Sequence, residues 1–278
     1  MKIFDPYIRS GTQSEADLKN LHYFGVQEVV TTAHGGHHFE TAADLIEYFE
    51  FLVDDECRRL RRCQLQPHVG LGVVPDAQPR RAHPEVWTAL ERMLDETSVV
   101  ALGEVGVWRD EEAHWELFRR QVRIADRVGP MPILVTPPRR LKVNLTYKMM
   151  NWLERYGYPP SKVVMGGLDE RMIKNVIDSG FCAGCPVGAA RNEPREIAGL
   201  LAELAGDDAG AERILLTAAL RSSGGDLLGI PKTIEALQQE GVDDATIQQL
   251  VYNNASRLFG TASSREASDS PGGRDETD

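Results

Sequence analysis

Short apolar runs alternate with longer amphipathic stretches along most of the chain. In the longer stretches apolar residues recur at a helical spacing, as at Leu45, Tyr48, Phe49 and Leu52, which is typical of helices with one buried face. The apolar runs have the length of buried strands. They cover residues 2–6, 27–32, 68–74, 99–105, 133–136, 162–165, 182–184 and 213–217. The pattern therefore predicts about eight strand-and-helix repeats.

Eight such repeats favour a closed barrel. Strands that are joined by helices form a parallel sheet, and eight repeats within 278 residues match a (β/α)₈ TIM barrel. An open, doubly wound sheet of the Rossmann type is the alternative. It has little support, because no G-x-G-x-x-G motif follows the first apolar run. The predicted fold class is α/β, with eight parallel strands in a TIM barrel.

The composition narrows the possible functions. Lys and Arg number 31 and Asp and Glu number 42, so the net charge is −11. This charge argues against general nucleic-acid binding, because phosphate contacts need a basic surface. No apolar run approaches the roughly 20 residues that span a bilayer, and the amino terminus has no signal-peptide pattern. We therefore expect a cytoplasmic protein without membrane insertion.

The end of the chain differs in composition from the rest. Residues 261–278 are rich in Ser, Gly, Asp and Glu. Apart from a single proline, they contain no apolar side chain larger than alanine. Such a segment cannot bury enough apolar surface to order itself. The sequence thus predicts one barrel domain over residues 1–260 and a disordered acidic tail over residues 261–278.

The residues around the predicted strand ends resemble, in order, the motifs of the TatD-like metal-dependent hydrolases. Residues 5–9 (DPYIR) resemble the D-P-H-I-H opening of an archaeal-type branch, and residues 99–106 (VVALGEVG) resemble its V-x-A-x-G-E-I-G strand. Further similarities lie at residues 132–140, 163–167, 214–219 and 253–260. The resemblance therefore extends over roughly residues 1–260 and implies the TIM barrel of that family.

The resemblance also implies a divalent metal site, often binuclear, that activates a water molecule for hydrolysis. Its ligands would be two histidines after the first strand, a glutamate after the fourth, histidines after the fifth and sixth, and an aspartate after the eighth. In this chain those positions hold Tyr7, Arg9, Glu104, Thr136, Gly167 and Ala219. Only the glutamate is retained, so Glu104 is expected to be a vestigial metal ligand.

The distribution of histidines supports the loss of this site. None of the seven histidines lies after His114, so the fifth to eighth strands cannot supply an imidazole. His34, His37 and His38 form an alternative ligand group, which could hold one zinc, manganese or magnesium ion together with Glu104 and Asp5. No acidic residue lies within that histidine group, and we therefore expect no cofactor.

Arginines follow several of the predicted strands. Arg9, Arg109, Arg139, Arg140 and Arg221 come after the first, fourth, fifth and eighth strands, and guanidinium groups bind phosphate or carboxylate through paired hydrogen bonds. Arg9 is expected to bind Glu104 in this way and to replace the lost metal cation. The predicted binding cleft consists of Tyr7, Arg9, Glu104, Thr136, Arg140, Gly167, Ala219 and Arg221.

Two functions agree with these observations. The first is a degenerate TatD-like homologue, a pseudoenzyme that acts as a binding or scaffold protein for an anionic small molecule. The alternative is an active TatD-like metal-dependent hydrolase that cleaves a phosphodiester or amide-type bond through a rearranged metal site. Metal content distinguishes them, because the hydrolase needs a bound ion and the binding protein does not.

Overall fold

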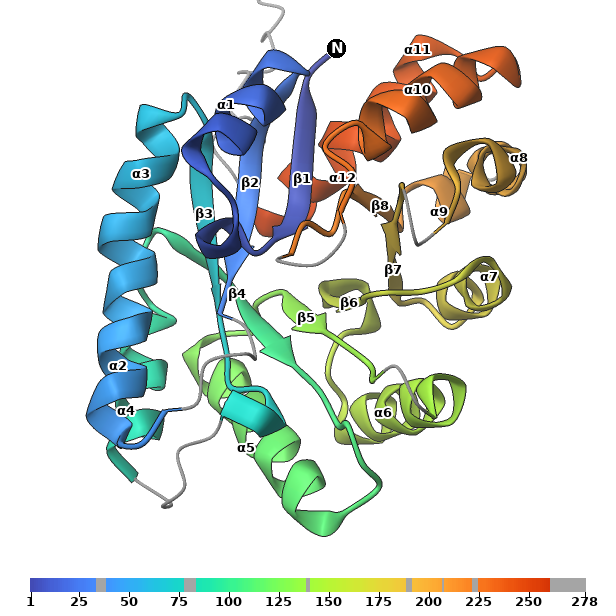
Figure 1. Cartoon of the computed structure of the whole chain (residues 1–278). Helices are drawn as coiled ribbons and strands as arrows, with labels where there is room; N and C mark the ends of the chain where they lie inside the picture. The colour runs from blue at the N-terminus through green and yellow to red at the C-terminus, as the bar shows by residue number, and fades with distance from the viewer. Residues whose placement is uncertain are drawn as a thin grey trace, which may run out of the picture.

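Eight parallel strands pair in sequential order from β1 to β8 in the computed structural model of this chain (Figure 1). The structure describes residues 1–33, 39–77, 84–138, 141–188, 192–206, 208–221 and 225–260. The predicted TIM barrel is confirmed, and every predicted strand is present. The strands are β1 (Ile3–Ile8), β2 (Val26–Thr32), β3 (Gln66–Leu71), β4 (Val99–Val105), β5 (Ile133–Val135), β6 (Val163–Met165), β7 (Cys182–Pro186) and β8 (Ile214–Thr217).

Helices follow the strands and surround the sheet (Figure 1). They are α1 (Glu15–Tyr23), α2 (Ala42–Phe51), α3 (Cys57–Arg62), α4 (Pro84–Met93), α5 (Glu112–Val128), α6 (Lys142–Tyr156), α7 (Glu170–Asp178), α8 (Pro194–Ala205), α9 (Asp208–Ala211), α10 (Gly229–Gln239), α11 (Asp244–Gln248) and α12 (Asn254–Phe259). Single π-helical segments, Leu52–Glu56 and Gln249–Asn253, continue α2 into α3 and α11 into α12. No helix within these described stretches is long and apolar enough to cross a membrane.

Local sequence signals start several of these helices. The Ser14 and Thr41 side chains accept hydrogen bonds from the backbone N–H groups of Asp17 and Asp44, which bond back and complete capping boxes at α1 and α2. Asp243 caps α11 in the same manner, accepting from two backbone N–H groups. These caps lie directly before apolar periodic stretches, so the capping residues and the hydrophobic pattern predict the same helix starts.

The third strand ends earlier than its apolar run predicts. The run continues to Val74, but β3 stops at Leu71. The buried Gln121 side chain of α5 accepts a hydrogen bond from the Val73 N–H at 2.7 Å and donates one to the Val73 carbonyl at 2.9 Å. Because a side chain satisfies this backbone, the apolar residues stay buried without continuing the sheet.

Strands β1 and β8 meet along a seam that side chains stabilise. The Thr217 hydroxyl donates to the Tyr7 carbonyl at 2.8 Å, and the Arg9 N–H donates to the Leu220 carbonyl at 3.0 Å. The fully buried Asp5 accepts hydrogen bonds from the backbone N–H groups of Tyr7 and Ala218, at 3.2 and 3.1 Å. Asp5 thus connects the first and last strands, and its oxygens face backbone donors.

A buried polar cluster connects the carboxyl-terminal helices to the barrel. Glu28 of β2 lies 2.8 Å from His68 Nε2 of β3 and accepts a short hydrogen bond from the Tyr252 hydroxyl. Burial alone would raise the pKa of Glu28, but the bonds from His68 and Tyr252 outweigh it and hold that pKa below its usual value. Glu28 is therefore ionised at neutral pH and bonded on both oxygens.

Removing the Tyr252 hydroxyl should weaken this connection. We expect Tyr252→Phe to lower the free energy of unfolding by about 1 to 3 kcal/mol, because a buried bond to a charged acceptor is lost. Urea unfolding at pH 7 measures the change. Tyr23, which is 82% exposed, provides the matched control, and Tyr23→Phe should change the same quantity by less than about 0.5 kcal/mol. Equal effects in the two variants would contradict a stabilising role for the cluster.

Candidate functional site

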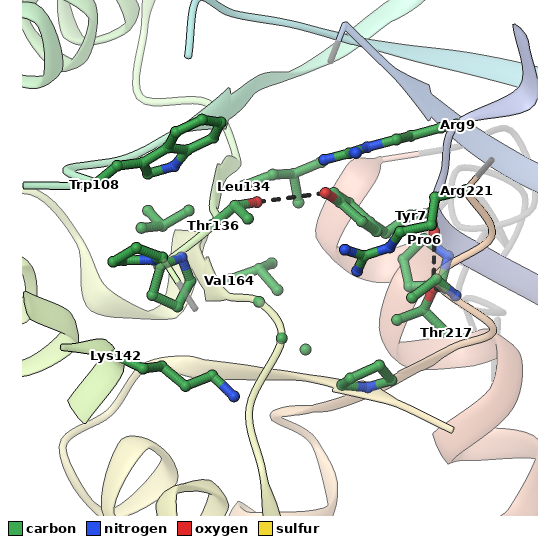
Figure 2. A pocket seen from close by; sticks show the side chains of 18 of the residues that line it. Pro6, Tyr7, Arg9, Trp108, Leu134, Thr136, Lys142, Val164, Thr217 and Arg221 are labelled. Atoms are coloured by element: carbon green, nitrogen blue, oxygen red, sulfur yellow. Dashed lines mark hydrogen bonds between the residues drawn. The ribbon is translucent and has the colours of Figure 1, made fainter. Parts of the chain in front are cut away.

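A cavity of about 790 Å³ opens at the carboxyl ends of the strands (Figure 2). Its walls come from residues in or after β1, β3, β4, β5, β6, β7 and β8, as expected for the functional end of this kind of barrel. The residues that the argument below uses are Tyr7, Arg9, Asp76, Trp108, Arg109, Thr136, Lys142, Gly167, Thr217, Ala219 and Arg221.

The guanidinium of Arg9 covers Glu104 at the cavity wall. Its Nε donates to Glu104 Oε1 and its Nη2 donates to Oε2, both at 2.8 Å. The Glu104 side chain is 0% exposed and the Arg9 side chain 16% exposed. The predicted bidentate pair is therefore confirmed. Glu104 is not among the described residues that line the cavity, because Arg9 covers its carboxylate.

Tyr7 and Thr136 bring two hydroxyl groups to the same region. The Tyr7 hydroxyl lies 3.5 Å from Thr136 Oγ1 (Figure 2). Burial and the nearby negative charge of Glu104 raise the pKa of Tyr7 above its ordinary value. Tyr7 therefore stays a neutral phenol. Gly106 allows the β5 backbone to approach, because a Cβ there would lie 2.4 Å from the Thr136 carbonyl oxygen.

Cationic side chains dominate the charges that line the cavity. Arg109, Lys142 and Arg221 join Arg9, whereas Asp76 is the only carboxylate among the described lining residues. Figure 2 shows the Arg221 side chain extended into the cavity beside Tyr7. Lys142 Nζ lies 3.6 Å from the Asp169 carboxylate, so Asp169 offsets part of its charge. The described lining is positive, although the whole chain carries a net charge of −11.

Comparison with known proteins shows which barrels this chain is similar to. No family model matches the chain. An uncharacterized metal-dependent hydrolase from Methanocaldococcus jannaschii is 23% identical over 261 residues, which cover 92% of this chain and 99% of that protein. A TatD-like protein from Archaeoglobus fulgidus superimposes with a TM-score of 0.74 at 20% identity, covering 93% of this chain and 100% of that one. Over nearly its whole length the chain is similar in sequence to a metal-dependent hydrolase and shares the fold of TatD-like proteins. A TatD family hydrolase from Entamoeba histolytica gives a TM-score of 0.65 at 12% identity, over 93% and 98% of the two chains.

The metal that the resemblance to the TatD-like family implies does not fit the residues at the six ligand positions of that family. Both Glu104 oxygens accept hydrogen bonds from Arg9, and Gly167 and Ala219 carry no polar side-chain atom. Tyr7 and Thr136 offer neutral hydroxyls, which are poor ligands for zinc. Among the side chains that the structure describes, no group of three or more His, Cys, Asp or Glu is arranged to hold a metal ion.

The alternative ligand group can be followed only in part. His34, His37 and His38 lie outside the described residues, as do Arg139 and Arg140. Asp5, the other carboxylate considered for that group, is fully buried and uses both oxygens as acceptors for backbone N–H groups at the β1–β8 seam. Asp5 is therefore a structural residue of the barrel in this conformation.

Several cavity residues escaped the sequence reasoning, among them Trp108 and Lys142. Trp108 and Lys142 lie three and seven residues after the ends of β4 and β5, beyond the positions directly after each strand. His114 orients the loop that carries Trp108. Its Nδ1 accepts from the backbone N–H groups of Trp108 and Arg109 at 3.3 and 3.1 Å. Burial lowers the pKa of His114, which favours the neutral imidazole that this role needs.

Proposed function

We propose that this TatD-like protein binds an anionic small molecule in the barrel cavity and does not act as a metal-dependent hydrolase. The bidentate Arg9–Glu104 pair is the observation that supports this function. It supplies a permanent cation beside the one glutamate that the family pattern retains, and it uses both oxygens that a metal would need.

The exchange of a metal for a guanidinium changes the chemistry available. A bound divalent ion lowers the pKa of a water molecule and so creates a nucleophile at neutral pH. A guanidinium holds charge and donates hydrogen bonds, but it has no open coordination position for water. Tyr7 stays protonated because its pKa is raised, so it does not supply an anionic nucleophile either. The remaining groups suit binding.

The lining of the cavity suits an anion. Four cationic side chains, Arg9, Arg109, Lys142 and Arg221, line the cavity, against the single carboxylate of Asp76 among the described lining residues. Arg9 also has N–H groups left, because a guanidinium has five donors and Glu104 accepts from two of them. A concave, partly apolar site with a few convergent donors is the ordinary form of a small-molecule site.

Metal analysis of protein purified without an affinity tag tests the first half of the proposal. We expect zinc, manganese and magnesium well below one ion per chain after dialysis. We also expect no chelator-sensitive hydrolysis of phosphodiester or amide bonds. Stoichiometric metal together with chelator-sensitive hydrolysis that Glu104→Ala abolishes would contradict the proposal. That result would support the alternative hydrolase with a rearranged metal site.

Thermal unfolding at constant ionic strength tests the second half. Inorganic phosphate should raise the melting temperature relative to chloride, because a ligand that binds the folded state stabilises it by mass action. Arg221→Met should reduce the rise, since it removes a cation from the cavity. Arg123→Met provides a control on α5, because Arg123 is exposed and does not line the cavity. Equal phosphate effects in both variants would show that the anion binds elsewhere.

A further inference from the structure

The two sides of the cavity differ in chemistry. Figure 2 shows Arg9, Tyr7 and Arg221 on one side and Trp108 with Lys142 on the opposite side. The first side carries two guanidinium groups and a phenol hydroxyl. The second presents the indole ring of Trp108, and Arg109, next to Trp108 in the chain, also lines the cavity. A ligand that contacts Trp108 as well as Arg9 and Arg221 therefore combines an apolar ring with an anionic group.

Apolar residues form much of the rest of the lining. The apolar lining residues are Pro6, Leu134, Val135, Pro137, Pro138, Val164 and Pro186. Proline rings and an indole are rigid and present flat faces. They therefore lose little conformational entropy when a ligand binds, and they favour a flat partner. Water gains few hydrogen bonds against such a surface, and an apolar group that displaces it binds favourably.

The cavity is larger than an inorganic anion needs. A volume of about 790 Å³ falls within the roughly 300 to 1,000 Å³ typical of sites for drug-sized organic molecules. A phosphate ion contacting Arg221 and Arg9 would leave the Trp108 side solvated. The cavity therefore has room for a ring system as well as for the anionic group.

We infer that the ligand is an organic anion with a planar apolar body, such as an aryl phosphate or an aromatic carboxylate. This inference rests on the proposed function and specifies its ligand class. The anionic group contacts Arg221 and the remaining N–H donors of Arg9, and the ring lies against Trp108.

Isothermal titration with matched probes tests this assignment. Methyl phosphate and phenyl phosphate share a head group and differ in the ring, and acetate and benzoate form the corresponding carboxylate pair. We expect the aromatic member of the better-bound pair to bind about 10-fold or more tightly than its methyl counterpart, because binding removes the apolar surface of the ring from water. The pair with higher affinity identifies the head group. Phenol, which lacks the anion, should bind far more weakly than phenyl phosphate.

Three variants separate the roles of the two sides. Trp108→Ala should remove most of the advantage of the aromatic probe and leave methyl phosphate or acetate binding unchanged. Trp108→Phe should restore part of that advantage, which guards against a general folding defect. Arg221→Met should weaken both members of a pair by the same factor. Trp87→Ala is the matched control, since Trp87 packs beside Arg120 and does not line the cavity, and it should change none of the affinities.

The failures of the two proposals are distinguishable. If methyl phosphate binds through Arg221 but phenyl phosphate binds no more tightly, the inferred ligand class is wrong and the anion site stands. If neither anion pair binds and Arg221→Met has no effect, the proposed function is wrong as well. If phenol binds as tightly as phenyl phosphate, the anionic head group is not recognised and both proposals are overturned.

Discussion

Replacing Arg9 with alanine is expected to lower the free energy of unfolding by about 3 to 5 kcal/mol. The substitution leaves the Glu104 carboxylate, which is 0% exposed, without the cation that holds both of its oxygens. The Thr32 hydroxyl still donates to Oε1 at 3.4 Å, but a buried carboxylate without a cationic partner must either remain charged in a setting of low polarity or take up a proton, and both are costly. Urea unfolding at pH 7 measures the loss directly.

Two controls show whether burial of the pair causes the effect. Arg9→Met combined with Glu104→Gln should cost much less than Arg9→Ala, because no buried charge is left unpaired. Arg127 and Glu91 form the same bidentate geometry at 2.9 Å, but their side chains are 57% and 40% exposed. Arg127→Ala should therefore cost under about 1 kcal/mol. An Arg9→Ala loss as small as that of Arg127→Ala would show that Glu104 finds another partner.

The contribution of Asp5 to the free energy of unfolding should fall as the pH rises from 4 to 7. Burial raises the pKa of Asp5 from 3.8 to about 6, although bonds from Thr217 and the backbone of Tyr7 and Ala218 oppose the rise. The folded protein therefore binds this proton more tightly than the unfolded chain does. The contribution to stability is fully present below pH 3.8 and is lost as pH rises through about 6. Between pH 4 and pH 7 the loss from this group is about 2 to 3 kcal/mol.

The Asp5→Asn variant isolates that contribution from other titrating groups. Carboxylates with lowered pKa, such as Glu28 and Asp226, change stability in the opposite direction, so the measured quantity is the difference between the two proteins. The native protein should exceed the variant by about 2 to 3 kcal/mol more at pH 4 than at pH 7. A difference that is constant over this range would show that Asp5 titrates normally.

The sequence by itself determined the barrel and its order of elements. Strand and helix signals in this fold are local, because each buried parallel strand is a short apolar run and each helix shows its own 3.6-residue periodicity. All eight predicted strands are present. The positions of Arg9 and Glu104 could also be paired from sequence, since carboxyl ends of barrel strands converge at one end of the molecule.

Other features were decided by contacts between residues far apart in the chain. The end of β3 depends on Gln121, 48 positions after Val73, and the seam depends on Asp5 and Ala218, which are 213 positions apart. No local pattern records such bonds. The opposition of Arg221 to Trp108 across the cavity (Figure 2) likewise follows from closure of the sheet. Local periodicity thus determined the elements. Closure of the barrel decided which side chains face each other, because only closure brings the first and last strands together.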